Sequence, residues 1–312
     1  MSNPTRYLSG VATVTAAQPL GNYPFPDPFH TGGVAGLDVF TYSTDYTDLG
    51  QVAANTVTGS SSTFALEAGI GGYAVLTPGA STTASSVYRT NSNFQFVSGQ
   101  KFWFVERVIP GLFATTGTYA FGLQFGSATT DGIWFTKPAS STEIRLVSSV
   151  NNTATTLLGT GGTISTTPVA THTTGSLTGG ATTSGLTTIT YTANTSLVVG
   201  QYIYGTGIPL NSTVVSIISS TSATISAPAS ATGSSLTFIY ATALDLALYY
   251  NGTDLLVYKS DSLVARIPNV TIGSTNAYTL TNQLLGPFIS CTPTATDLLH
   301  ADYVLVAQET VR

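Results

Sequence analysis

The chain has 312 residues, of which 9 are Lys or Arg and 14 are Asp or Glu, so its formal net charge at pH 7 is −5. Charged residues make up only 7% of the sequence, but an aromatic content of 10% and a mean hydropathy of +0.26 exclude a disordered polar chain. Because the few basic residues are scattered and nucleic-acid binding needs clustered positive charge, the composition excludes a nucleic-acid partner.

The first 35 residues differ from the rest of the chain, because residues 22–29 carry three prolines in five positions. Proline fixes φ and cannot donate to a central ladder, so residues 1–35 are predicted to form an extended arm. The arm either closes one side of its own sandwich or lies on a neighbouring molecule. Its candidate contacts with a partner are Tyr23, Phe25, Pro26 and Phe29.

Residues 36–167 are predicted to form the first part of a β-sandwich, because side chains alternate there with a period of two. Residues 101–109 place Phe104 and Glu106 on one face, and Trp103 and Arg107 on the other. Since both faces of this segment are largely apolar, it is predicted to be a central strand. Further strands are predicted at residues 119–125, 132–135 and 143–147.

A long uncharged stretch follows, because no Asp, Glu, Lys or Arg occurs from residue 146 to residue 244, a run of 99 residues. Within it, residues 160–188 are rich in Gly and Thr and are predicted to be a connection. Residues 200–238 contain short strands separated by Gly- and Pro-containing turns, which indicates a small β domain. Since sandwich-type strands occur on both sides, residues 168–239 are predicted to be inserted at a surface loop.

Residues 240–312 are predicted to complete the sandwich. Strands at residues 244–250 and 255–259 flank Asn251-Gly252, a strong hairpin signal because both residues tolerate positive φ. Residues 264–267 continue this meander, and residues 301–307 form a last strand. Many short strands joined by tight turns indicate an all-β fold, a β-sandwich or jelly roll.

Catalytic residues are not evident in this sequence. The acidic residues are isolated, and no predicted strand repeats them at the spacing of a glycosidase pair. Glu106 is expected to be the buried partner of a positive group near Arg107 or of Arg145. Of the three distant histidines, His30, His172 and His300, the last is expected at a solvent-exposed turn. We therefore expect that the protein is not an enzyme.

The sequence also gives no signal of a metal site, an intrachain disulfide or a membrane-spanning segment. The single cysteine, Cys291, allows no intrachain disulfide and no four-ligand zinc site. Gly205-Thr206-Gly207 lacks the lysine of a phosphate-binding loop and is predicted to be a turn between strands. No apolar run approaches the roughly 20 residues that span a bilayer, and no signal peptide is evident. We expect no cofactor, no membrane partner, and synthesis in a cytoplasm.

Several short signatures follow one another along the chain. They lie at residues 6–11, 19–22, 26–28, 102–107, 121–124, 131–135, 248–252, 265–268 and 302–304. In these signatures and their order the chain resembles a family of bacteriophage virion proteins over most of residues 1–165 and 241–312, and the resemblance implies a lectin-like jelly roll. Residues 205–209, 213–214 and 225–226 resemble a small β module that recurs in phage tail and head proteins.

The resemblance implies a capsid decoration, or cement, protein that binds the major capsid protein. Such a protein would sit on the capsid surface of the virion after assembly in the host cytoplasm. We also expect a homo-oligomer, a trimer or a dimer, because long strand edges with few lysines otherwise invite uncontrolled pairing.

The alternative function is a carbohydrate-binding adhesin on the tail or head that contacts the host surface. Lectin-like sandwiches bind sugars through exposed aromatic side chains. The candidate contacts with a surface glycan are Trp134, Tyr249 and Tyr250, although aromatic residues on strands are more often part of the core.

Overall fold

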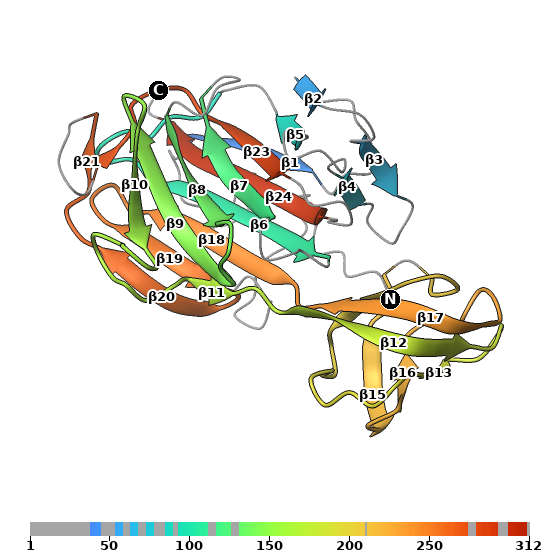
Figure 1. The fold of residues 1–312 in the computed structure, drawn as a ribbon. Coiled ribbons are helices and arrows are strands. Elements are labelled where there is room, and N and C mark those ends of the chain that lie inside the picture. The colour runs from blue at the N-terminus through green and yellow to red at the C-terminus, as the bar shows by residue number, and fades with distance from the viewer. Residues whose placement is uncertain are drawn as a thin grey trace.

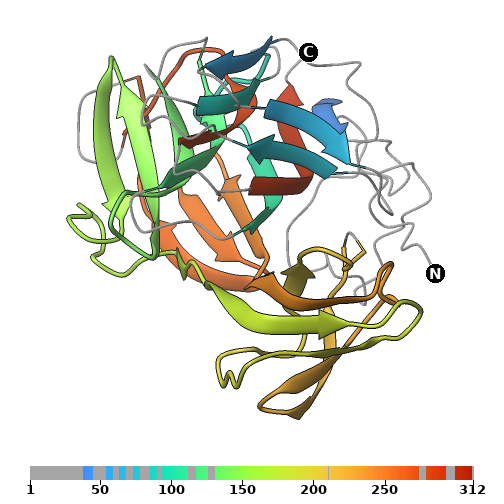
Figure 2. The same cartoon turned by 45° about the vertical axis from the view of Figure 1, so that its right-hand side comes forward.

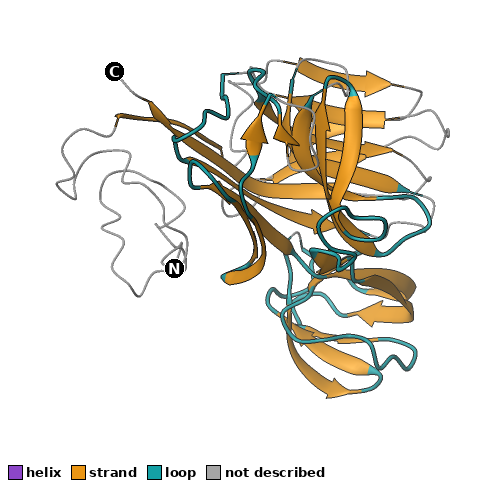
Figure 3. Ribbon diagram, turned by 90° about the vertical axis from the view of Figure 1, so that its left-hand side faces the viewer, coloured by secondary structure: helices purple, strands orange, loops and turns teal. Residues whose placement is uncertain are grey.

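The computed structural model describes residues 38–44, 54–58, 63–67, 73–77, 85–89, 93–111, 117–125, 131–209, 211–273, 279–292 and 299–310. These residues form strands joined by turns and loops, and no helix occurs among them (Figures 1 and 3). None of the described segments is therefore a helix that could cross a membrane. The predicted arm, with its candidate contacts Tyr23, Phe25, Pro26 and Phe29, lies outside the described residues.

Two antiparallel sheets of eight strands each form a β-sandwich (Figures 1 and 2). In the first, sheet I, β1 (Asp38–Thr44) pairs with β24 beside the main path. The main path of sheet I runs β20 (Ser262–Ile267), β19 (Leu255–Lys259), β18 (Leu244–Tyr250), β6 (Phe102–Pro110), β24 (Leu299–Thr310), β4 (Tyr73–Thr77) and β3 (Thr63–Glu67).

Sheet II also has seven strands on its main path and one strand beside it. Its path runs β10 (Thr153–Leu158), β9 (Glu143–Val150), β8 (Gly132–Lys137), β7 (Thr118–Gln124), β23 (Gly286–Thr292), β5 (Ser85–Arg89) and β2 (Ala54–Thr58). The short β11 (Ala170–Thr171) pairs with β9, and β21 (Thr271–Ile272) pairs with β22 (Thr279–Leu280) in a small parallel ladder. Strands from distant parts of the chain are neighbours in both sheets, and the predicted all-β, lectin-like jelly-roll sandwich is confirmed.

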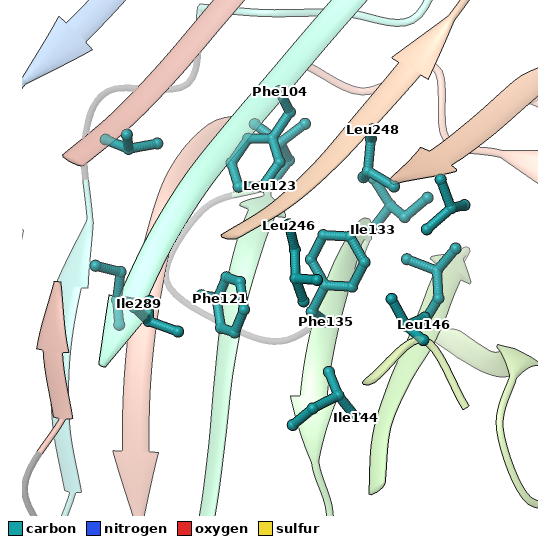
Figure 4. Packing of buried hydrophobic residues seen from close by; sticks show 14 of the residues in the cluster. Phe104, Phe121, Leu123, Ile133, Phe135, Ile144, Leu146, Leu246, Leu248 and Ile289 are labelled. Carbon is teal, nitrogen blue, oxygen red and sulfur yellow. The ribbon is translucent and has the colours of Figure 1, made fainter. Parts of the chain in front are cut away.

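The core lies between sheets I and II, because alternate side chains of each strand point to the same face. Phe104 of β6 and Leu246 of β18 extend from sheet I toward Phe121 of β7 and Phe135 of β8 in sheet II (Figure 4). All four side chains are fully buried. Burying one such side chain stabilises a fold by about 1.5–3 kcal/mol, so this layer holds the two sheets together.

A third sheet of six strands forms a separate unit, which we call the β module (Figures 1 and 2). Its path runs β14 (Tyr202–Tyr204), β17 (Gly233–Ala241), β12 (Thr174–Thr182), β13 (Thr188–Thr190), β16 (Ser222–Ile225) and β15 (Val214–Ser219). A bridge between Tyr202 and Thr213 links the two ends of this path, so the sheet curls toward closure. The β module has a hydrophobic cluster of its own, which includes Phe238 and Ile203.

The chain enters and leaves the β module at one place, because Thr174 of β12 pairs with Ala241 of β17. The strands of the module's sheet therefore lie between residues 174 and 241, while β11 still belongs to the sandwich. The exact division of the chain at residues 168 and 239 stays a prediction.

One sequence prediction about this region is wrong: residues 160–188 are not a plain connection, since they contain β11 and β12. A Cβ atom on Gly175 would lie 2.3 Å from the Tyr240 hydroxyl oxygen, and one on Gly180 would lie 2.5 Å from Phe238 Cε2. The rings of β17 thus occupy the space that side chains of β12 would need. The strand is rich in glycine because its partner supplies the side-chain volume.

Candidate functional site

The three aromatic residues predicted to contact a glycan do not lie together. Tyr250 is fully buried, and its hydroxyl donates a hydrogen bond of 2.7 Å to the Gly252 carbonyl oxygen. Its assignment as a glycan contact is therefore wrong, because it belongs to the core between the sheets. Trp134 and Tyr249 are half-buried and point outward, the first from sheet II and the second from sheet I.

The outer face of sheet I carries a continuous group of aromatic and aliphatic side chains, which we call the aromatic face. Tyr249 of β18 is the cross-strand neighbour of Trp103 of β6, and their rings stack with centroids 5.3 Å apart and an interplanar angle of 24°. The remaining members are Val105, Ala247, Leu256, Tyr258, Tyr303 and Leu305. Tyr249, Leu256 and Tyr303 are its accessible members, since the other side chains are mostly covered.

An ion pair borders the aromatic face at the end near Trp103. Lys101 Nζ lies 2.9 Å from Glu309 Oε1, and the Lys101 backbone N–H donates to Glu309 Oε2, also at 2.9 Å. The hydrogen bond to Glu309 raises the pKa of Lys101. Glu309 is held by two contacts on a strand of the sheet, so its carboxylate has a fixed position beside the aromatic rings.

A second charged group lies at the opposite end, where Arg107 is the cross-strand neighbour of Asp245. Arg107 Nε lies 3.3 Å from Asp245 Oδ1, and its Nη1 lies 3.6 Å from Asp302 Oδ2. Burial alone would lower the pKa of Arg107, but Asp245 and Asp302 raise it, so the guanidinium stays charged. A β-bulge between Ala301 and Tyr303 turns Asp302 toward this arginine.

Beyond Arg107, the β module packs against the outer face of sheet I. Tyr204 of β14 stacks on His300 of β24, with ring centroids 5.0 Å apart and an interplanar angle of 2°. Val75 and Ile109 of the sandwich pack in the same small cluster as Tyr202 and Tyr204. His300 is only 4% exposed, so the expectation of a solvent-exposed turn residue is wrong. The module therefore forms a border beside Arg107.

The outer face of sheet II offers a smaller aromatic group. Trp134 of β8 meets Phe288 of β23 edge to face, with ring centroids 6.3 Å apart. Gly122 of β7 lies between them, and a Cβ atom there would lie 2.6 Å from Trp134 Cα. The glycine thus lets the two rings meet across an intervening strand.

Glu106 does not have the partner expected from the sequence. Its side chain points into the core, it is fully buried, and neither carboxyl oxygen has a hydrogen-bond partner among the described residues. Arg145 pairs with Glu143, and Arg107 pairs with the two aspartates named above. Burial raises the pKa of Glu106 well above its ordinary value, because the charged form would lose its hydration in the core.

Two other predicted features concern ligand sites. Gly205 and Gly207 form the turn that follows β14, where the Ile208 N–H donates to the Gly205 carbonyl oxygen at 3.0 Å.

In the part of the chain that the structure describes, no group of three or more His, Cys, Asp or Glu side chains is placed to hold a metal ion. The aromatic face is therefore the candidate functional site.

Three solved structures are weakly similar to this chain. A protein of unknown function from Shewanella oneidensis MR-1 aligns with a TM-score of 0.44 at 11% identity, covering 89% of each chain. A prokaryotic beta-1,3-1,4-glucanase (lichenase) from a mouse hindgut metagenome aligns with a TM-score of 0.42 at 10% identity, over 86% of this chain and 98% of that one. The CBM2 module of the evolved Dit of Lactobacillus casei BL23 phage J-1 aligns with a TM-score of 0.38 at 9% identity, over 89% and 99%. Similarities this distant do not assign a function.

Comparisons at the level of sequence add no family. A scan against protein-family models found no match, and a search of curated proteins found none. The resemblance to phage virion proteins, the capsid partner, the homo-oligomer and the virion location therefore stay predictions.

Proposed function

We propose that the protein binds carbohydrate on the aromatic face of sheet I. The observation that carries the proposal is the stack of Tyr249 on Trp103, bordered at both ends by ion pairs. A sugar ring has an apolar face of C–H groups that packs on an aromatic ring, and hydroxyls that need positioned donors and acceptors. Tyr249 supplies the first kind of contact, and the Lys101–Glu309 and Arg107–Asp245 pairs supply the second.

The charges of the face favour a neutral sugar. Lys101 and Arg107 are each already paired with carboxylates, and the whole chain has a net charge of −5. A carboxylated or sulfated glycan would therefore meet no unpaired positive group on this face and would be repelled by the protein as a whole. The ion pairs act instead as fixed hydrogen-bonding groups whose geometry selects the hydroxyl pattern.

A glycan array followed by titration calorimetry tests this proposal, with matched variants on the two outer faces. Tyr249→Ala removes the accessible ring of the aromatic face, and we expect it to weaken sugar binding by about tenfold or more. Trp134→Ala removes a half-buried ring from sheet II and should leave binding unchanged. If Trp134→Ala abolished binding while Tyr249→Ala did not, the site would lie on sheet II and the proposal would be wrong.

A second candidate function, decoration of a phage capsid through its major capsid protein, is favoured by a different observation. Residues 146–244, which include the whole β module, contain no Asp, Glu, Lys or Arg. A contact made by such a surface depends on shape, apolar groups and hydroxyls, so salt should not weaken it. The Debye length falls from about 10 Å at 0.1 M salt to about 3 Å at 1 M, which removes most attraction between exposed charges.

Co-sedimentation of the purified protein with capsids that lack it tests this second function. We expect the protein to remain on the capsid at high salt as well as at low salt. Absence of binding at both salt concentrations, or release at high salt, would contradict capsid decoration through an uncharged surface.

A further inference from the structure

Two segments of the β module expose aliphatic side chains, which together we call the aliphatic patch: Val198, Val199, Val215, Ile217 and Ile218. Each is between 40% and 58% exposed, and together they are five of the nine large hydrophobic residues that are exposed in the described part of the chain. Single exposed aliphatic residues are ordinary, but a cluster of this kind marks a contact surface or a risk of aggregation.

Backbone hydrogen bonds connect the two chain segments that carry these residues. The Gly200 N–H donates to the Val214 carbonyl oxygen at 2.8 Å, and the Val214 N–H donates to the Gln201 carbonyl oxygen at 2.9 Å. These bonds place the turn with Val198 and Val199 beside the start of β15. The two chain segments that carry the patch are therefore neighbours in the β module.

The strand that carries most of the patch is at the edge of the module's sheet. β15 is exposed at every residue after Val214, and from Ser216 onward it pairs with β16 alone. Its hairpin with β16 extends from the part of the module that lies away from the sandwich (Figure 1). The strand has no charge and no proline, the residues that usually keep a strand edge from pairing with other molecules.

The geometry of β15 favours contact through side chains. The register with β16 shifts between Val214 and Ser216 and again between Ile217 and Ser219. Such bulges make the ladder of N–H and C=O groups irregular, so an added strand could not pair along the whole edge. A partner therefore has to cover the valine and isoleucine side chains.

The distribution of charge indicates what that partner is. All 9 basic and all 14 acidic residues lie outside residues 146–244, so two copies of this chain repel each other through their sandwiches but not through their β modules. Contact between two modules buries aliphatic surface without burying a charge, and it keeps the charged sandwiches at the far ends. We propose that the aliphatic patch binds the same patch on a second copy, which gives a two-fold symmetric dimer.

This proposal goes beyond carbohydrate binding and does not depend on it. Sedimentation of the full chain over a concentration series should show a monomer–dimer equilibrium. Ile218→Lys places a charge at an exposed position of the patch, and we expect it to weaken dimerisation by about tenfold or more. Leu263→Lys is the matched control, since Leu263 is 52% exposed on β20, an edge strand of sheet I, and this change should leave the equilibrium unchanged.

Two further measurements separate this dimer from other associations. Val215→Lys should act like Ile218→Lys, and circular dichroism should show that all three variants keep the strand signal of the wild type. The dimer should also persist at high salt, because no charged group takes part in it. A wild type that stays monomeric, a dimer that survives both patch variants, or equal loss with Leu263→Lys would overturn the proposal.

Discussion

The sandwich and the β module are both built from antiparallel strands, but they differ in where ionisable groups lie. The sandwich buries Glu106, Lys137, His172 and Asp302, each with no more than 5% exposure. The β module contains no Asp, Glu, Lys or Arg at all, and its core is a cluster of aliphatic and aromatic side chains. Since only groups whose pKa changes on folding make stability depend on pH, that dependence should arise in the sandwich at all pH values below those at which tyrosines ionise.

The largest expected effect of pH on the free energy of unfolding comes from His172, which lies between β11 and β12. Its Nδ1 shares a hydrogen bond of 2.9 Å with the Tyr119 hydroxyl, and the buried Lys137 lies near enough to act on its charge. Burial, and then the positive charge of Lys137, lower the pKa of His172 from 6.5 to about 4. The folded protein therefore holds this imidazole in its neutral form.

Acid should therefore destabilise the sandwich through His172. Above pH 6.5 the side chain is neutral in both states, whereas between pH 6.5 and about pH 4 only the unfolded chain binds the proton. The free energy of unfolding should thus fall by roughly 3 kcal/mol across this range from this group. Urea denaturation at a series of pH values measures the effect, and His172→Gln should flatten the curve.

Tyr119→Phe is the control for this prediction. It removes the hydrogen bond but keeps the burial and the charge of Lys137, which are the causes of the lowered pKa. The free energy of unfolding of Tyr119→Phe should be lower than that of the wild type at all pH values. Its decrease between pH 6.5 and pH 4 should remain. Parallel curves for the wild type and His172→Gln would contradict the role of the histidine and place the acid sensitivity elsewhere in the sandwich.

The two regions also differ in how far the sequence predicts them. In the sandwich, alternation with a period of two locates β6, β18 and β24, because large side chains mark the buried face. In the β module, the glycines of β12 hide the same pattern, since Tyr240 and Phe238 of another strand fill the missing volume. That information lies about 60 residues further along the chain, so reading β12 alone could not supply it.

The candidate site was partly visible in the sequence. Alternation places Trp103 and Arg107 on one face, and the sequence predicts Tyr249 as a contact with a glycan. The same prediction for Tyr250 is wrong, and the sequence holds a sufficient signal of its burial, because Tyr250 shares its face of the strand with Leu246 and Leu248. The stack of Tyr249 on Trp103 could not be predicted, because it depends on the pairing of β18 with β6 across the inserted β module.

Glu106 is expected to have a smaller effect on the free energy of unfolding, with a dependence on pH opposite to that of His172. Below pH 4.5 this side chain is protonated in both states, whereas above that pH the unfolded chain loses the proton and the folded core retains it. The free energy of unfolding should therefore fall as the pH rises through and above 4.5. The buried carboxyl also leaves both oxygens without hydrogen bonds, which costs stability at every pH.

Two substitutions separate these contributions. Glu106→Gln keeps the shape and the unpaired polar atoms but cannot ionise, so its gain over the wild type should grow as the pH rises. Glu106→Leu also removes the unpaired polar atoms, and we expect it to raise the free energy of unfolding by about 1–3 kcal/mol at pH 7. Urea denaturation at pH 5, pH 7 and pH 9 measures both. Equal differences from the wild type at all three pH values would show that folding does not raise the pKa of Glu106, and would contradict this prediction.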